Sequence, residues 1–147
     1  MPNEYYGFFP LDLFRLGSSQ SNKIDVVRNS DIAELEFYRC KGVDSKAPSG
    51  APGEVRWLKG GPAGGISLFD DIDTAPITGK FWYKISRNVD IPDGLGLIDS
   101  RRRPGRATHY QIFPAVDMPY DNFILLLRQI AEDVRVDPMF VAAHTTR

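Results

Sequence analysis

The chain has 147 residues, and its 18 lysines and arginines against 19 aspartates and glutamates give a formal net charge of -1. This near balance excludes the strong overall positive charge on which nonspecific nucleic-acid binding depends. A chain of this length can bury a core of its own, so we expect a single domain spanning residues 1–147. The lone cysteine, Cys40, excludes an intramolecular disulfide and a multi-cysteine zinc site, and we expect no metal.

The N-terminal segment Met1–Pro10 lacks the basic and apolar regions of a secretory signal peptide. No apolar stretch approaches the roughly 20 residues that a membrane-spanning helix needs, and the longest candidate, Phe123–Leu127, is followed by Arg128. We therefore expect a soluble, cytoplasmic protein, in a producer or a target cell, with no membrane contact.

The first predicted element is a short strand within Leu11–Gly17, in which Arg15 lies on the face opposite Phe14 and Leu16. A buried arginine requires an anionic partner. That partner is either a carboxylate of the protein or a phosphate of a ligand, and the sequence leaves both open.

Residues Asp31–Arg39 fit a short helix with Asp31 as its N-cap, and a strand over Leu35–Tyr38 is the alternative. The glycine- and proline-rich stretch Lys41–Gly65 predicts mostly loop, interrupted by a brief strand at Arg56–Leu58.

Two further strands are predicted at Ile66–Phe69 and Lys80–Ser86, because apolar and aromatic residues concentrate there. Asp90–Arg106 reads as an irregular surface loop around a basic cluster, and His109–Val116 resumes strand character. The members of the basic cluster are Arg101, Arg102, Arg103 and Arg106.

An amphipathic helix beginning at Asp121 is the clearest predicted element, because its apolar residues recur at helical spacing. These residues are Phe123, Leu126, Leu127, Ile130, Ala131 and Val134. The tail Asp137–Arg147 has no strong period and is expected to fray. Several short strands with few helices predict an α+β fold.

Two features taken alone have ordinary structural explanations. The run Gly60–Gly65 can bring backbone amides close to a ligand, but it matches neither a P-loop nor a dinucleotide-binding fingerprint, and a simple turn is the commoner explanation. His109 can donate, accept or transfer protons near neutral pH, but a lone histidine on a strand is more often structural.

Together, these pieces resemble the type VI secretion effector 2 family of bacterial cytotoxins and its relatives. Leu13–Arg15 is similar to the family's L-[FY]-R strand, and Gly64–Asp70 to its G-G-x-S-x-F-D step. Ile91–Asp99 follows at similar spacing. Ala107–Ala115, with Met118 after it, resembles the A-T-H-Y-x-I-x-P-A segment that precedes the family's terminal helix.

The resemblance implies an ADP-ribosyltransferase-like split β-sandwich that uses NAD as its substrate. It places Arg15 at the position that contacts NAD phosphate or ribose, Ser67 beside the nicotinamide ribose, and His109 among the residues required for toxicity. The residues implied to bind the nucleotide are Arg15, Ser67, Phe69, Tyr110 and Gln111. Phe69 and Tyr110 are pocket-wall residues in this interpretation, although ordinary core positions remain the alternative.

Two residues depart from the family pattern. Ile66 stands where a threonine is common before the motif serine, and Gln111 stands near the third motif, where many ADP-ribosyltransferases have a glutamate. A carboxylate stabilises an oxocarbenium-like transition state, and Gln111 cannot ionise. The resemblance therefore implies slow chemistry, a carboxylate from elsewhere such as Asp70 or Asp117, or a changed reaction.

The leading hypothesis is a toxin that cleaves the nicotinamide–ribose bond of NAD and passes ADP-ribose to an unknown macromolecule or to water. The resemblance also implies an immunity protein as partner. The alternative is a noncatalytic binding module of the same fold that engages a host factor through the basic loop at 101–106. A phosphotransferase acting on an RNA 2′-phosphate is a third hypothesis.

Overall fold

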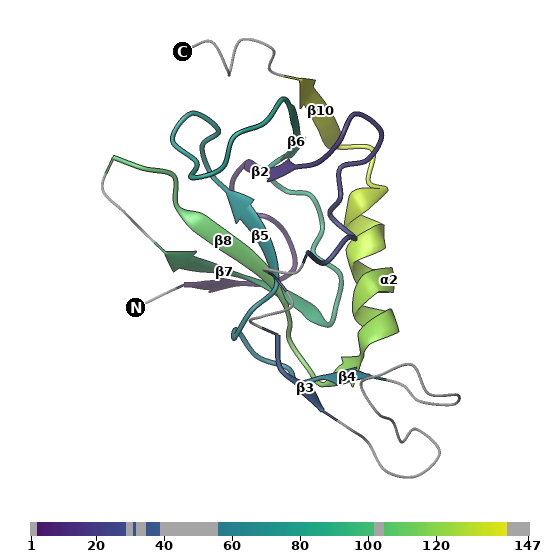
Figure 1. Ribbon diagram of the computed structural model, residues 1–147. Helices are drawn as coiled ribbons and strands as arrows, with labels where there is room; N and C mark the ends of the chain where they lie inside the picture. Colours follow the sequence, from purple (N-terminus) through teal and green to yellow (C-terminus); the bar gives the residue numbers. More distant parts are fainter. Residues whose placement is uncertain (1–2, 29–30, 32–34, 39–55, 102–104, 141–147) are drawn as a thin grey trace.

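The computed structural model describes residues 3–28, 31, 35–38, 56–101 and 105–140, which form ten strands and one helix, labelled α2 in Figure 1. The strands are β1 (Glu4–Tyr5), β2 (Leu13–Leu16), β3 (Phe37–Tyr38), β4 (Trp57–Leu58), β5 (Ile66–Phe69), β6 (Phe81–Ile85), β7 (Leu95–Arg101), β8 (His109–Pro114), β9 (Met118–Pro119) and β10 (Val136–Phe140). The helix spans Tyr120–Ala131.

Seven of the strands form one antiparallel sheet in the order β1-β7-β8-β5-β2-β6-β10. The remaining three form a small sheet, β3-β4-β9, which lies near the first turn of α2 (Figure 1). The described chain is therefore mostly β, with α2 on one side of the large sheet, which is compatible with the α+β class.

The main hydrophobic core lies between α2 and the large sheet. The helix buries Phe123, Leu127 and Ile130, which are spaced four and three residues apart and so share one face. The sheet contributes apolar side chains that alternate along its strands. These include Leu13, Ile66, Leu68, Ile85, Leu97, Tyr110 and Ile112.

A second, smaller cluster covers part of the opposite face of the sheet. It consists of Phe69, Ile72, Trp82 and Ala107, with Phe14 and Leu16 packed against them. Phe14 and Leu16 therefore point away from Leu13 and Arg15, as the alternation along β2 predicts. Because both faces of the sheet are covered at β2, the Arg15 side chain is buried.

Several sequence-based predictions are confirmed. The predicted strands appear as β2, β4, β5, β6 and β8. The predicted amphipathic helix appears as α2, although Val134 lies beyond its end and is 91% exposed.

The prediction of an irregular loop over Asp90–Arg106 is wrong in its central part. Leu95–Arg101 forms β7, the longest of the described strands, which pairs with both β1 and β8. The glycines that suggested a loop have local roles: Gly94 adopts a φ of 97° before the strand, and Gly96 lies under the rings of Phe113 and Tyr6. Of the basic cluster, residues 102–104 lie outside the described part.

The predicted fraying of the tail is wrong for its first residues. Val136–Phe140 forms β10, which pairs along its length with β6 at the edge of the sheet. Pro138 fits there because an edge strand leaves one row of backbone groups unpaired. Residues 141–147 lie outside the described part of the chain.

The expected helix over Asp31–Arg39 falls largely on residues that are not described, namely 32–34 and 39. The described remainder contains β3, within the strand considered as the alternative. Asp31 itself has helical backbone, and its carboxylate accepts a hydrogen bond from the backbone N–H of Arg28, which precedes it. The backbone N–H groups that an N-cap at Asp31 would bond belong to residues outside the described part, so its role as a cap stays a prediction.

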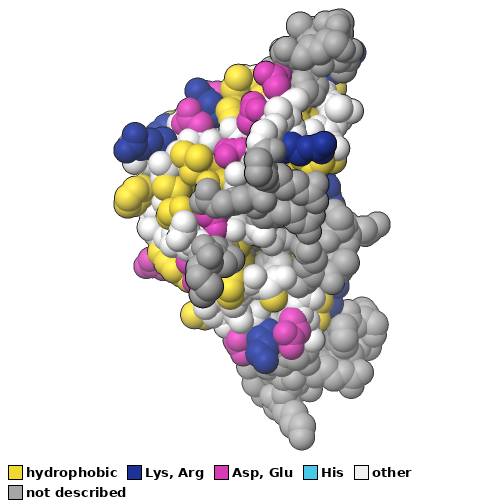
Figure 2. Space-filling view, turned by 90° about the vertical axis from the view of Figure 1, so that its left-hand side faces the viewer, with side chains coloured by type: hydrophobic (Ala, Val, Ile, Leu, Met, Phe, Trp, Pro, Cys, Tyr) yellow, Lys and Arg dark blue, Asp and Glu magenta, His cyan; other side chains and the backbone are white. Residues whose placement is uncertain are grey.

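The surface at the left of Figure 1 is drawn in Figure 2, where apolar, acidic and basic side chains are interspersed. Among the described side chains visible there, neither sign of charge forms an extended patch. This distribution agrees with the near-zero formal charge of the whole sequence.

Candidate functional site

The candidate site lies between Arg15 on β2 and Ser67 on β5, where the pairing of these two strands ends. We call this place the seam. β2 pairs with β6 over four residue pairs and β5 with β8 over four, but β2 and β5 share the single pair Phe14 and Phe69. Beyond that pair the backbone ladder between β2 and β5 stops, and the Arg15 side chain takes its place.

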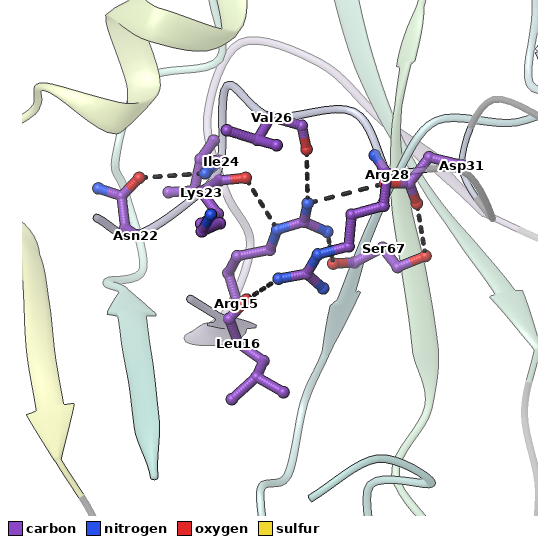
Figure 3. A network of polar contacts seen from close by, with 9 residues as sticks. All are labelled: Arg15, Leu16, Asn22, Lys23, Ile24, Val26, Arg28, Asp31 and Ser67. Carbon is purple, nitrogen blue, oxygen red and sulfur yellow. Dashed lines mark hydrogen bonds and ion pairs between the residues drawn. The ribbon is translucent and has the colours of Figure 1, made fainter. Parts of the chain in front are cut away.

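Arg15 bonds to three backbone carbonyls around the seam (Figure 3). Its Nε donates to the carbonyl oxygen of Lys23 at 3.1 Å, Nη1 to that of Ser67 at 2.9 Å, and Nη2 to that of Val26 at 2.8 Å. The residue is only 1% exposed. Arg15 therefore ties β2 to β5 and to the segment 23–26, and each of its guanidinium nitrogens has an acceptor in the protein.

The anionic partner that a buried arginine requires is Asp31. Its Oδ2 lies 3.7 Å from Nη2 of Arg15 and accepts the Arg28 backbone N–H at 2.9 Å, while Oδ1 accepts the Ser67 hydroxyl at 3.2 Å. Asp31 is also 1% exposed, so the pair is desolvated and depends on these additional hydrogen bonds. Of the two partners left open by the sequence, the structure contains the protein carboxylate.

A second guanidinium adds positive charge to the seam. The Arg28 side chain donates through Nη2 to the Leu16 carbonyl oxygen and lies beside Arg15 in Figure 3. Burial, assisted by the charge of Arg28, lowers the pKa of the Arg15 guanidinium to about 10, while Asp31 acts in the opposite direction. Arg15 is thus still protonated at neutral pH, and its positive charge lies beside that of Arg28.

Four of the sequence-predicted site residues share the face of the sheet that points away from α2. In the β5–β8 register Ser67 lies opposite Gln111, and Phe69 opposite His109. Residues directly opposite each other on antiparallel strands project to the same side. The rings of Phe69 and His109 are in contact, with centroids 5.2 Å apart.

His109 also contacts a hydroxyl from the neighbouring strand. Oγ of Ser100, on β7, lies 2.6 Å from Nδ1 of His109 and donates to the His109 carbonyl oxygen at 3.1 Å. A β-bulge between Asp99 and Arg101 shifts the register at this point and brings Ser100 beside the histidine. The imidazole is therefore held between Ser100 and the Phe69 ring.

Tyr110 is not brought together with these residues. It follows His109 on β8, so its side chain projects to the opposite face, where it is 5% exposed within the core under α2. Gln111 is equally buried, at 5% exposure, but lies on the Ser67 face.

The two aspartates considered as substitutes for a catalytic glutamate bind backbone amides. Asp70 accepts the Thr108 N–H at 2.7 Å, and Asp117 accepts the Gly60 N–H at 2.8 Å. Both contacts fasten loop backbone next to the motif strands. The carboxylate that bonds to the motif serine is instead Asp31.

Sequence reasoning missed Arg28, Asp31 and Ser100 as site residues. Arg28 precedes the predicted helix in a segment without periodicity, the pattern at Asp31 indicates only a helix cap, and Ser100 lies at a bulge in a stretch that reads as loop. The only available signal was indirect: a buried Arg15 implies a carboxylate somewhere in the chain.

Two features are absent from the described residues. No group of three or more His, Cys, Asp or Glu side chains is placed to hold a metal ion within the described ranges. In the same part of the chain, no helix has both the length and the hydropathy that a bilayer crossing requires.

Comparisons with known proteins gave no relatives. The chain matches no model of a known protein family, and no curated protein matches it significantly. The geometry of the seam and the residues around it therefore indicate what the chain can bind.

Proposed function

We propose that the chain is an NAD-dependent ADP-ribosyltransferase-like toxin domain that acts inside target cells. It cleaves the nicotinamide–ribose bond of NAD and transfers ADP-ribose to a macromolecule or to water, and its fold is a split β-sandwich of the ADP-ribosyltransferase type. One observation carries the proposal: β2, β5 and β8, which carry Arg15, Ser67 and His109, are consecutive in the sheet.

The charge at the seam supports a dinucleotide as ligand. Arg15 and Arg28 lie beside each other at the seam, and among the described residues Asp31 is the carboxylate that pairs with Arg15. Guanidinium groups bind phosphate oxygens in pairs, and partial desolvation strengthens that interaction. In this proposal half-buried Arg28 contacts the diphosphate of NAD, while buried Arg15 shapes the seam that receives it.

The side chains on one face of β5 and β8 suit the nicotinamide riboside, which is the reacting end of NAD. Ser67 is half-buried beside the seam, and Phe69 and His109 lie two pairs further along the strands, on the same face. Flat apolar side chains suit the nicotinamide ring, and a hydroxyl suits the ribose. We place the nicotinamide riboside over this row, with Gln111 as a neutral hydrogen-bonding group.

The reaction proceeds by substitution at the anomeric carbon. The C–N bond breaks with its electron pair going to the positively charged nicotinamide nitrogen, which becomes neutral, and the acceptor oxygen or nitrogen bonds to the ribose carbon and loses a proton. Without a glutamate at the third motif, negative charge near the oxocarbenium-like centre comes from Asp31, through its hydrogen bond to Ser67. We expect slow turnover for this reason.

The test is an assay of nicotinamide release and of labelled ADP-ribose transfer with purified protein, NAD and a cell extract. Ser67→Ala and His109→Ala are expected to lose turnover while remaining folded, and Ser67→Ala also lowers the melting temperature because it removes a hydrogen bond to buried Asp31. Arg87→Ala, which removes an exposed arginine just after β6, is the matched control and keeps full turnover. Absence of nicotinamide release by the wild-type protein would overturn the proposal.

A second candidate function is the noncatalytic binding module of the same fold. The observation that favours it is that each nitrogen of the Arg15 guanidinium already bonds to a protein acceptor, together with the neutral Gln111. This alternative predicts that charge reversal of exposed Arg106 abolishes toxicity while His109→Ala does not. The enzyme proposal predicts the opposite ranking.

An immunity protein is part of either proposal, because a toxin active in the cytoplasm has to be neutralised in the cell that makes it. The expected partner covers the seam or the exposed loops. Co-expression of neighbouring reading frames with the chain, followed by growth measurement, identifies such a partner.

A further inference from the structure

The contacts of Ser100 with His109 constrain where the imidazole carries its proton. A serine hydroxyl has a single hydrogen and can donate only one hydrogen bond, although its oxygen can also accept. Here that oxygen makes two contacts with the same histidine, one to the backbone carbonyl at 3.1 Å and one to Nδ1 at 2.6 Å. The carbonyl has no hydrogen, so it can only accept.

Both contacts are satisfied in one arrangement. The Ser100 hydroxyl donates its hydrogen to the His109 carbonyl oxygen, and its lone pair accepts the hydrogen on Nδ1. In the other arrangement the hydroxyl donates to Nδ1, and two acceptors, Oγ and the carbonyl oxygen, then face each other at 3.1 Å without a hydrogen between them. Ser100 is half-buried, so an unsatisfied contact of this kind is costly.

We infer that Ser100 is a positioning residue that holds neutral His109 in the tautomer with the proton on Nδ1, so that Nε2 carries the lone pair of the ring. The Phe69 ring, 5.2 Å away between centroids, restricts the imidazole from the β5 side. The bulge at Asp99 and Arg101 makes the contact possible, because it carries Ser100 to the level of His109.

The consequence for catalysis rests on the proposed function. With the lone pair on Nε2, His109 acts as a general base that takes the proton from the acceptor hydroxyl or water as its oxygen bonds to the anomeric carbon. The opposite tautomer would present an N–H at Nε2 and could not accept that proton. Ser100 thus determines which proton transfer His109 can perform, without touching the substrate.

The first test is the tautomer itself, read by long-range ¹H–¹⁵N NMR of the ¹⁵N-histidine-labelled chain. The sequence has only two histidines, His109 and His144, so a His144→Gln variant assigns the spectrum. At the alkaline end of a pH titration, where the ring is neutral, the wild type is expected to give Nδ1 at a protonated, pyrrole-type shift. A lone-pair, pyridine-type shift for Nδ1 overturns the inference.

Variants of Ser100 separate positioning from a merely structural role. Ser100→Ala is expected to move the proton toward Nε2, Ser100→Thr to restore the wild-type pattern, and Ser86→Ala, at a half-buried serine after β6, to leave it unchanged. An unchanged tautomer in a folded Ser100→Ala variant also overturns the inference.

The activity measurement distinguishes this inference from the proposed function. In Ser100→Ala, kcat for nicotinamide release is expected to fall with KM nearly unchanged, by at most the roughly 10²- to 10⁴-fold that general acid–base catalysis supplies. If the wild type shows the Nδ1–H tautomer but releases no nicotinamide, the proposed function fails and the positioning of His109 stands. Full kcat in Ser100→Ala, with turnover in the wild type, overturns the catalytic consequence.

Discussion

Nη1 of Arg15 lies 2.9 Å from the carbonyl oxygen of Ser67, and this hydrogen bond crosses the seam where the ladder between β2 and β5 stops. A guanidinium thus replaces backbone pairing at the centre of the large sheet. The same group holds the Lys23 and Val26 carbonyls, so it also fixes the segment that packs over the seam. Stability and the shape of the candidate site therefore depend on one side chain.

The first prediction concerns this buried ion pair. Arg15→Met leaves the Asp31 carboxylate without its cation in a desolvated place, and the free energy of unfolding is expected to fall by about 3–5 kcal/mol. The double variant Arg15→Met/Asp31→Asn removes the uncompensated charge and is expected to recover part of that loss. Urea unfolding measures both, and a loss below about 1 kcal/mol for the single variant would contradict a structural role of the pair.

The second prediction compares two leucines of α2. Leu127 is fully buried against the large sheet, whereas Leu125 is 54% exposed. Leu127→Ala is expected to lower the free energy of unfolding by about 2–5 kcal/mol, because it leaves a cavity in the main core. Leu125→Ala, with the same change in helix propensity, is expected to stay within about 0.5 kcal/mol of the wild type. Equal losses would mean that α2 packs on the sheet through another face.

The third prediction concerns the glycine that precedes β5. A Cβ on Gly65 would lie 1.8 Å from the carbonyl oxygen of Ile112, a backbone atom of β8 that cannot move without disturbing the sheet. Gly65→Ala is therefore expected to cost at least the roughly 1–3 kcal/mol typical of overpacking. The loss would appear as a lower denaturation midpoint in urea.

Gly79→Ala is the control for that change. Its Cβ would lie 2.6 Å from Cδ1 of Leu16, which is the end of a flexible side chain and can rotate away. We expect a smaller loss than for Gly65→Ala. The reverse order would show that the β5–β8 pairing tolerates displacement at this position.

The fourth prediction concerns acid stability at the turn from α2 to β10. The hydrogen bonds of the Arg135 guanidinium with the Asp133 carboxylate, at 2.8 and 3.0 Å, hold the pKa of that carboxyl below its usual value. A carboxyl with a lowered pKa in the folded state stabilises the fold above its unfolded-state pKa, and the contribution disappears as the pH falls through the folded-state pKa.

Asp133→Asn is accordingly expected to lower Tm at neutral pH, with the difference from the wild type vanishing toward the acid end of the carboxylate range. Arg135→Gln removes the same pair from the other side and is expected to follow the same pH course. A difference that stays constant down to low pH would assign the stabilisation to the turn backbone rather than to the ion pair. Thermal melts in steps of pH provide the measurement.

The local pattern of the sequence determined most of the elements. Alternation in Leu13–Leu16 placed Arg15 on the face opposite Phe14, and the spacing of Phe123, Leu127 and Ile130 defined α2. These features depend on neighbours a few residues away, which is the range over which backbone geometry fixes the direction of side chains. The resemblance likewise rested on short local motifs, and no comparison with known proteins tests it.

The tertiary structure alone decided which strands are neighbours, which carboxylate meets Arg15, and how Ser100 reaches His109. β7 read as a loop because a glycine lies in it and glycines and prolines lie on both sides of it in the sequence, and it is a strand because β1 and β8 pair with it on both sides. Asp31 lies 16 positions after Arg15, and its local pattern indicated only a helix cap, so its contact with Arg15 follows from how the chain packs over the seam. Pairing and burial join residues that are distant in the chain, and their energies exceed the local preferences from which a sequence is read.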